Sequence, residues 1–258
     1  MIDWIQGEKF RLLADGDTIF YCHTHQLGSL FENLSSHSKY ILITYNSDGG
    51  VMDHAIMGHW ADSSDMPDNL IKWYSQNVNV INERIESLPI GLENDKWFRN
   101  IGKKDKMYNL LQQPKPFKNL VYMNHNILTN PEKRTKPYQV LDNKSWVTIE
   151  NGTNGHGFDE YIHDVYAHHF VICPEGNGID THRTWETLYM NSIPVEKRNI
   201  NNQFYTDLPI CFVDDWEEIT EEFLNNEYCR IKNTQWNMDK LTFTYWKEKI
   251  LLSKWTGI

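Results

Sequence analysis

A series of short apolar runs, separated by helix-like segments, is the feature that most constrains how this chain folds. In the N-terminal half, residues 18–24, Tyr40–Tyr45 and residues 85–88 have the length and composition of strands, and Leu27–Leu34 has the pattern of a helix. Short strands that alternate with helices are typical of parallel sheets with helices on both faces. The N-terminal half is therefore predicted to be an α/β unit.

The C-terminal half repeats this alternation. Strands are predicted at Asn119–Asn124 and at residues 170–173, 193–196 and 210–213, and helices at Phe158–Ala167 and at residues 180–191, 217–225 and most of 238–255. Residues 102–118 are rich in lysine and contain two prolines, which makes them the most linker-like stretch. We therefore predict two domains, residues 1–115 and 116–258, with a cleft between them and a C-terminal helix that can cross back.

Composition and charge narrow the class of protein. Because 40% of the 258 residues are hydrophobic, the chain is expected to fold, and its formal net charge of -10 disfavours a general nucleic-acid binder. The four cysteines have neither a Cys-x-x-Cys pair nor zinc-like spacing, so free thiols in a reducing compartment are expected. The N-terminal segment is too polar for a secretory signal, and no run approaches the roughly 18 apolar residues of a membrane span. We expect a cytoplasmic protein with no transmembrane segment, which would meet a membrane only peripherally.

Residues 173–195 contain the pattern most directly tied to chemistry. An apolar strand ends at Cys173, a glycine-containing loop follows, and Asp180 or Thr181 can cap the next helix. Glycine permits unusual backbone conformations and close approach of a ligand, and a helix N-terminus favours an anion. The predicted phosphate-binding loop consists of Pro174, Glu175, Gly176, Asn177 and Gly178.

Two charged residues follow this loop on the predicted helix. Arg183 and Glu186 are three residues apart and share a helix face. The planar guanidinium group can neutralise a diphosphate, and the carboxylate can accept hydrogen bonds from ribose hydroxyls. The alternative is an Arg–Glu surface pair on an ordinary helix.

Residues 170–220 resemble the C-terminal part of the exostosin-like glycosyltransferases. The matching residues are Pro174, Gly176, Gly178, Arg183, Glu186, Ile193, Pro194, Val195, Leu208, Pro209, Asp215 and Trp216. The resemblance implies a GT-B architecture, in which two small Rossmann-like domains face a central cleft and the C-terminal domain binds a nucleotide-sugar donor. It also implies an inverting hexosyl- or pentosyltransferase with no cofactor and no essential divalent metal. Typical enzymes of this architecture are longer, so the N-terminal domain would be a trimmed version.

The segment after the first strand of the C-terminal half supplies further candidates. In the implied fold this strand ends at the cleft, so Asn126 and Arg134 are predicted to face the diphosphate or the donor sugar. The alternative is a plain polar loop with an Asn-Pro turn.

An inverting transfer also needs a general base, which we expect on the N-terminal domain at the carboxyl ends of its strands. His25 and Asp53, which follow the first and second predicted strands, are the two candidates. The leaving diphosphate would be stabilised by Arg183, aided by Arg134 and a helix N-terminus. The His23-x-His25 pair lacks an evident third metal ligand, and Asp215 is interpreted as part of a loop that closes the donor domain.

Other classes of protein remain as alternatives. A non-catalytic glycan-binding module of the same fold would bind no nucleotide. A dehydrogenase or an epimerase would need a Gly-x-Gly-x-x-Gly after the first strand of either half, and neither half has one. A glycan or glycoconjugate is the expected acceptor, and modified DNA is the alternative that the net charge disfavours.

Overall fold

Two separate parallel sheets organise the molecule, whose computed structural model describes residues 2–34, 36–53, 65–96, 102–150 and 157–256. The N-terminal sheet has four strands in the order β1-β2-β3-β4, and all three neighbouring pairs are parallel. Its strands are β1 (Ile19–His23), β2 (Tyr40–Tyr45), β3 (Leu70–Ser75) and β4 (Ile85–Ser87). All six residues of β2 are buried because this apolar strand lies between two neighbours and under helices on both faces.

The C-terminal sheet has five strands in the order β6-β5-β7-β8-β9, again with every pair parallel. Its strands are β5 (Asn119–Asn124), β6 (Val147–Glu150), β7 (His168–Ile172), β8 (Ile193–Lys197) and β9 (Cys211–Val213). The chain first moves outward to β6 and then returns past β5 to β7, so the connections change direction between β5 and β7. Open α/β sheets bind ligands at the carboxyl ends of the strands where this happens.

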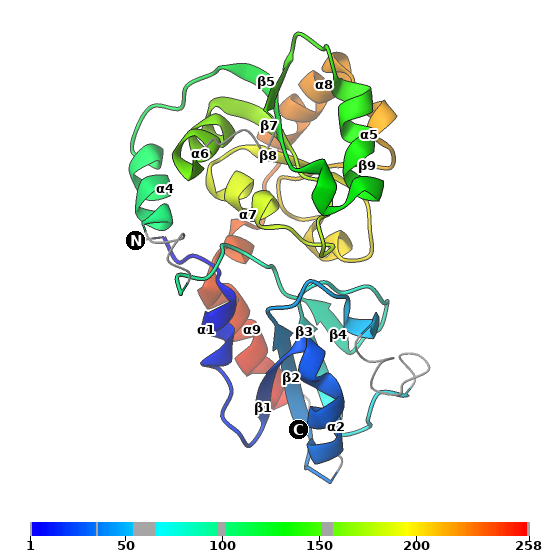
Figure 1. Ribbon diagram of the computed structural model, residues 1–258. Coiled ribbons are helices and arrows are strands. Elements are labelled where there is room, and N and C mark those ends of the chain that lie inside the picture. Colours follow the sequence, from blue (N-terminus) through cyan, green and yellow to red (C-terminus); the bar gives the residue numbers. More distant parts are fainter. Residues whose placement is uncertain (1, 35, 54–64, 97–101, 151–156, 257–258) are drawn as a thin grey trace.

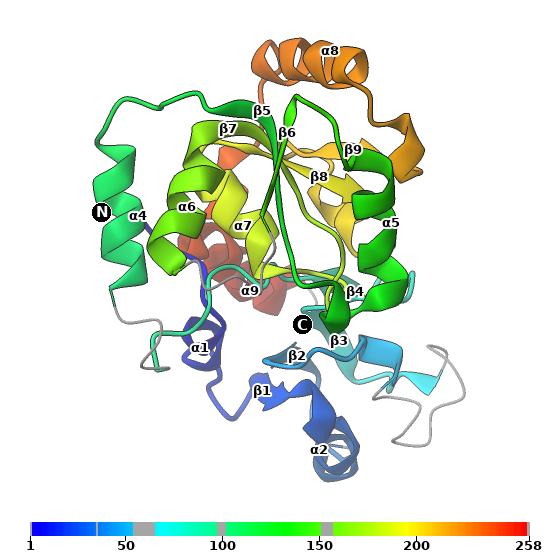
Figure 2. The same ribbon diagram turned by 45° about the horizontal axis from the view of Figure 1, so that its top comes forward.

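Helices cover both faces of the C-terminal sheet (Figure 2). α6 (Phe158–Ala167) and α7 (His182–Tyr189) lie on one face, and α5 (Pro131–Leu141) and α8 (Glu221–Lys232) on the other. The predicted α/β class with two parallel sheets is therefore confirmed. In the part of the chain that the structure describes, no helix has both the length and the apolar character needed to cross a membrane.

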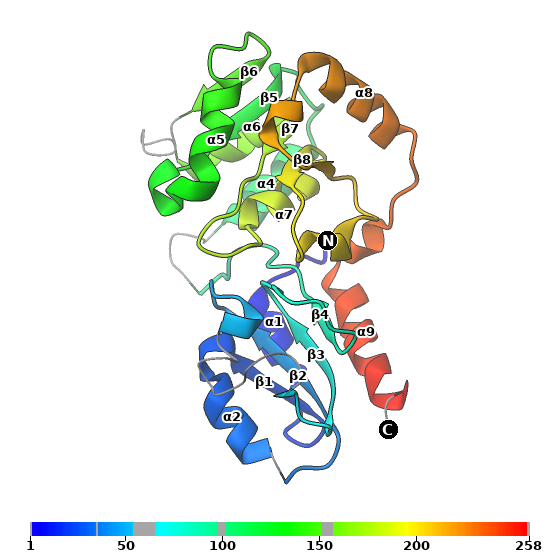
Figure 3. The same ribbon diagram turned by 90° about the vertical axis from the view of Figure 1, so that its right-hand side faces the viewer.

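The N-terminal sheet is covered by helices from both ends of the chain. α2 (Leu27–Leu34) packs on one face, whereas α1 (Gly7–Arg11) and α9 (Phe243–Thr256) pack on the other. Figure 1 and Figure 3 show α9 leaving the C-terminal half and running down beside the N-terminal strands. The C-terminal helix thus crosses back to the first sheet.

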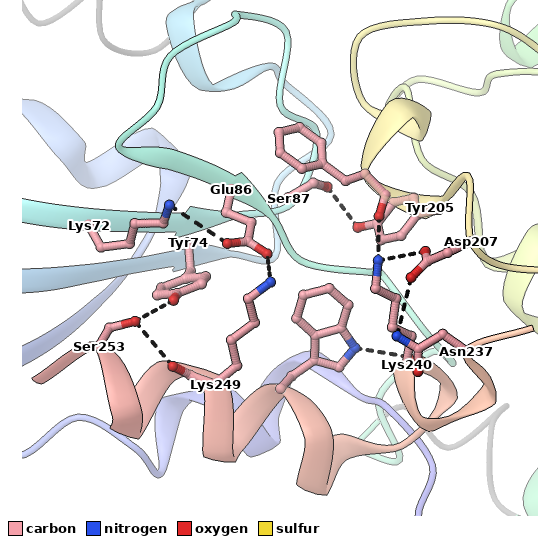
Figure 4. A network of polar contacts seen from close by, with 12 residues as sticks. Lys72, Tyr74, Glu86, Ser87, Tyr205, Asp207, Asn237, Lys240, Lys249 and Ser253 are labelled. Atoms are coloured by element: carbon pink, nitrogen blue, oxygen red, sulfur yellow. Dashed lines mark hydrogen bonds and ion pairs between the residues drawn. The ribbon is translucent and has the colours of Figure 1, made fainter. Parts of the chain in front are cut away.

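Polar contacts fix α9 on the sheet edge (Figure 4). Lys249 pairs with Glu86 of β4, and the hydroxyl groups of Tyr74 and Ser253 are 2.6 Å apart. Trp246, on the same helix, is fully buried and donates its indole N–H to the main-chain carbonyl of Lys240 at 2.9 Å. The helix is therefore an integral layer of the N-terminal domain.

The two halves share one apolar core and several buried hydrogen bonds. The largest cluster of buried side chains contains Ile43 and Tyr74 from the N-terminal sheet as well as Val171 from the C-terminal sheet. Asn201 accepts hydrogen bonds from the main-chain N–H of Val78 at 2.9 Å and from another N-terminal side chain at 2.8 Å. Because water is excluded from these contacts, they hold the halves in one relative position.

Several segments differ from the sequence-based expectation. Residues 102–118 are not an irregular linker throughout, because α4 (Lys103–Leu111) occupies their first part. α5 and β6 were not predicted, since α5 contains two prolines and is polar, and β6 is only half-buried. The four cysteines, all of them described, are free thiols as predicted.

Replacement of Trp246 should reveal how strongly α9 supports the fold. Trp246→Ala leaves a large buried cavity and should lower the free energy of unfolding by about 3–5 kcal/mol. Trp255→Ala, on the same helix but 81% exposed, is the matched control and should change it by less than about 0.5 kcal/mol. Urea denaturation followed by tryptophan fluorescence and circular dichroism measures both. Equal effects of the two substitutions would show that α9 does not pack as described.

Candidate functional site

A cleft of about 790 Å³ opens at the carboxyl ends of the C-terminal strands, where the two halves meet. We call it the arginine pocket, because Arg134 and Arg183 both line it. Its other C-terminal lining residues are Asn124, Gly157, Phe158, Tyr161, Gly176, Asn177, Gly178, Asp180, Thr181, His182 and Glu186. Asp48, Ile90 and Glu93 line it from the N-terminal half, and Lys103 of α4 completes it. The volume is in the usual range for a small-molecule site.

The loop at residues 174–178 forms one wall of this pocket, and its glycines are needed for close packing. A Cβ at Gly176 would lie 2.8 Å from Nη2 of Arg134, and a Cβ at Gly178 would lie 2.8 Å from Nδ2 of Asn77. Neither glycine has a positive φ, so the expected need for unusual backbone conformations is wrong here. The loop instead lets a guanidinium group and the N-terminal domain approach its main chain.

Arg134 enters the pocket from α5 and is 8% exposed. Its Nε donates to the carbonyl of Glu175 at 2.8 Å, and its Nη1 donates to the carbonyl of Asn126 at 3.0 Å. These neutral acceptors orient the group without cancelling its charge. Burial and the positive charge of Arg183 lower the pKa of Arg134 to about 10.

Arg183 reaches the same pocket from the first turn of α7. Its buried Nε has no hydrogen-bond partner, and its guanidinium carbon lies 5.9 Å from the ring centre of Tyr161. Thr181 is the N-cap of α7, and its side chain does not bond to the N–H groups of the first turn. Within the described ranges, neither Arg134 nor Arg183 forms an ion pair with a carboxylate. The pocket therefore places two arginine side chains beside a helix N-terminus, with the carboxylate of Glu186 acting on Arg183 without a direct ion pair.

Glu186 lies one helical turn beyond Arg183 and lines the same pocket. The hydroxyl of Tyr161 donates to Oε2 of Glu186 at 2.7 Å. The two predicted charged residues thus share one side of the pocket, with an aromatic ring next to both. Among the described residues, Arg183 and Glu186 form no direct ion pair, but the carboxylate of Glu186 contributes to the raised pKa of Arg183.

Three of the predicted donor-binding residues lie away from the pocket lining. The side chain of Asn126 caps a short helix by accepting from Leu128 N at 2.9 Å, so only its main chain supports Arg134. Glu175 turns its carboxylate the other way, where Asn199 donates to it at 3.0 Å. Pro174 is buried outside the pocket lining. These residues shape the loop instead of facing the pocket.

Asp180 lines the pocket, but its carboxylate forms hydrogen bonds that join the two halves of the molecule. Its two oxygens accept from the main-chain N–H of Ile90 at 2.7 Å and from the indole N–H of Trp185 at 2.9 and 3.1 Å. The main-chain N–H of Asp180 donates to Asn77 of the N-terminal half at 2.9 Å. Burial raises the pKa of Asp180 to about 6.

A second cavity of about 430 Å³ continues from the first, and we call it the histidine pocket. His23, His25 and His182 line it, and the first two rings stack with centroids 5.5 Å apart. Asp53 does not line it, because its carboxylate closes its own loop by accepting from Gly50 N at 3.0 Å and from a neighbouring asparagine at 3.1 Å. The placement of Asp53 at the cleft was wrong.

Four residues belong to both pockets, and two titratable ones among them had no sequence signal. Asp48, Ile90, Glu93 and His182 line the arginine pocket and the histidine pocket alike. Glu93 and His182 were missed, because one lies in an irregular loop and the other was hidden beside Arg183 in the helix pattern. Asp48 follows β2, and Asn177 donates to it at 3.4 Å across the cleft.

Other polar groups near the loop at residues 174–178 have structural roles. Asp215 caps a short helix in a reciprocal capping box with Glu218. A cavity of about 400 Å³ on the far side of Glu175 is rimmed by ion-paired side chains such as Lys197–Asp215 and Arg198–Asp214. Among the described residues, no group of three or more His, Cys, Asp or Glu side chains is arranged to hold a metal ion.

The comparisons with known proteins do not place the chain in a family. No protein-family model matches the sequence, and no curated protein matches it significantly. The fold and the charged cleft therefore define an α/β protein of two parallel sheets with a candidate anion site between them.

The substitution Asp180→Asn removes the titration of the Asp180 carboxyl group, so comparison with the wild type shows its effect on stability. The folded-state pKa of Asp180, about 6, lies above the ordinary value of 3.8, so folding favours the protonated carboxyl. Its contribution to stability is therefore fully present below pH 3.8 and is lost as the pH rises through 6. Relative to Asp180→Asn, the wild-type protein should lose about 2 kcal/mol of unfolding free energy between about pH 4 and pH 7.

Urea denaturation of both proteins at the two pH values measures this difference. Asp17→Asn, at an exposed position, is the control and should follow the wild type at both. If the difference in unfolding free energy between the wild type and Asp180→Asn stays constant or grows with pH, the burial of the Asp180 carboxylate is contradicted.

Proposed function

We propose that the protein is a glycosyltransferase of GT-B architecture that uses a nucleotide-sugar donor. The arginine pocket would bind the donor, and the histidine pocket would admit the acceptor hydroxyl. Arg134 and Arg183 would neutralise the diphosphate, with the N-terminus of α7 as a third source of positive potential. As the diphosphate leaves, its growing charge would be stabilised by these groups without a metal ion.

The observation that carries this proposal is the pairing of two like charges in one pocket. Burial and then the charge of Arg183 lower the pKa of Arg134, whereas Tyr161, Cys173 and Glu186 raise the pKa of Arg183 against the effect of burial. A dianionic ligand between the two arginines would form two charge-assisted contacts. The buried and unpartnered Nε of Arg183 is a hydrogen-bond donor that such a ligand would satisfy.

The neighbourhood of Glu186 supports a nucleotide over inorganic phosphate. Its carboxylate lies at the wall of the same pocket, beside the rings of Tyr161 and Phe158. A carboxylate accepts from ribose hydroxyls, and aromatic rings provide faces for a base. The pocket volume of about 790 Å³ would then accommodate a nucleoside as well as its phosphates.

A screen of UDP-, GDP-, TDP- and CMP-sugars by thermal shift and calorimetry tests donor binding. At least one should stabilise the wild-type protein as its concentration rises above the dissociation constant. Arg183→Ala and Arg134→Ala should each weaken that binding roughly 10- to 100-fold, because each removes a charge-assisted contact. Arg230→Ala, an exposed arginine that pairs with Glu227 on α8, is the matched control and should bind like wild type.

Three results would overturn the proposed function. The first is that no nucleotide sugar shifts the wild-type melting temperature. The second is that Arg183→Ala and Arg134→Ala bind as tightly as Arg230→Ala. The third is binding without hydrolysis or transfer of any donor, which would contradict the transferase activity.

Glu186→Ala tests the assignment to ribose. The wild-type protein should bind the ribonucleotide that emerges from the screen about 10-fold more tightly than its 2′-deoxy or its 3′-deoxy analogue, because the hydroxyl–carboxylate contact is lost. In Glu186→Ala both analogues should bind as well as the parent nucleotide. Tyr161→Phe keeps the carboxylate and should retain the discrimination. Unchanged discrimination in Glu186→Ala would remove this residue from the ribose site.

A further inference from the structure

The junction of the two pockets contains a histidine with a fixed orientation. His182 lines both the arginine pocket and the histidine pocket, together with Glu93. Nδ1 of His182 lies 2.7 Å from the carbonyl oxygen of Gly91. A carbonyl only accepts hydrogen bonds, so Nδ1 carries a hydrogen and, in the neutral ring, Nε2 is the proton-accepting atom.

A carboxylate faces Nε2 of His182. Oε2 of Glu93 lies 3.6 Å from it, beyond a normal hydrogen bond but close enough to stabilise a positive ring. The other oxygen of Glu93 accepts from a main-chain N–H at 3.1 Å, which holds the carboxylate in place. No donor occupies Nε2 among the residues that the structure describes. A hydroxyl group that enters the pocket can therefore donate its hydrogen to Nε2 of His182.

We infer that His182 is the general base of the transfer, with Glu93 as its positioning and charge-stabilising partner. This inference rests on the proposed function. In the step, the acceptor O–H bond breaks and its proton passes to Nε2 of His182. The oxygen forms a bond to the anomeric carbon, and the bond from that carbon to the phosphate oxygen breaks, with both electrons leaving on the nucleoside phosphate.

The position of His182 at the junction of the two pockets distinguishes it from the other candidates for the general base. His25 is exposed, stacks on a neighbouring histidine and lines only the histidine pocket. Asp53 lines neither pocket. Asp48 is at the junction but is exposed, and histidine is the side chain that ordinarily exchanges protons near neutrality. His182 alone among these combines the junction with a fixed tautomer.

The test uses the full chain and the nucleotide sugar that stabilises it in the screen, with water as the acceptor in a hydrolysis assay. His182→Asn keeps a side-chain N–H for Gly91 but removes the proton-accepting nitrogen. It should lower kcat about 100-fold or more while the donor binds within 3-fold, roughly, of wild type. His182→Ala should behave similarly, and added imidazole should restore part of its turnover.

His163→Asn, at an exposed position on α6, is the matched control and should leave kcat unchanged. If the donor binds and His182→Asn hydrolyses it at the wild-type rate, or if only His25→Asn loses turnover, the inference fails and the proposed function stands. If no nucleotide sugar binds the wild-type protein, both fail. Loss of turnover in His182→Ala without rescue, accompanied by loss of donor binding, would assign His182 to the fold or to the donor instead.

Discussion

The contact on which the site depends is the buried carboxylate of Asp180. It holds the main chain after β4 with one oxygen and the start of α7 with both, while its own N–H group bonds to Asn77. The position of Arg183 relative to the N-terminal domain is thereby set by hydrogen bonds that water does not reach. Neither domain alone would present the complete arginine pocket, because part of its wall comes from each.

This arrangement explains how two arginines can remain close without a carboxylate between them. Arg134 is restrained by two carbonyl oxygens, and Gly176 leaves the space that its guanidinium group requires. Their mutual repulsion is a modest destabilisation that the shared core of both domains offsets. A site of this kind is organised before a ligand arrives, so little of the binding energy is spent on ordering side chains.

The sequence predicted the elements whose pattern is local. Tyr40–Tyr45 and Asn119–Asn124 are strands over the predicted residues, because each is an apolar run bounded by turns. α4 was mistaken for linker, since it has a single buried residue, Met107, and its lysines hide any periodicity. β6 was not predicted because its four residues are all half-buried. Hydrophobic patterns in the sequence do not reveal elements whose side chains are only partly buried.

Local sequence patterns predicted the site residues of the C-terminal half but not those that meet at the domain interface. Arg183 and Glu186 lie in one pocket because three residues separate them on a helix, which a sequence reveals directly. Asp53 was misplaced because its hydrogen bonds to its own loop have no sequence signature. The meeting of Glu93 with His182 depends on how two domains dock, which no spacing encodes.

The return of α9 to the first sheet has a consequence for how the chain folds during synthesis. The strands β1 to β4 leave the ribosome first, but one of their faces receives its cover from Phe243–Thr256, more than 150 residues after β4. That face, with Ile43 and Tyr74, stays partly exposed to water while the C-terminal domain is still being made. The packing of this face is therefore completed only after Phe243–Thr256 has been synthesised.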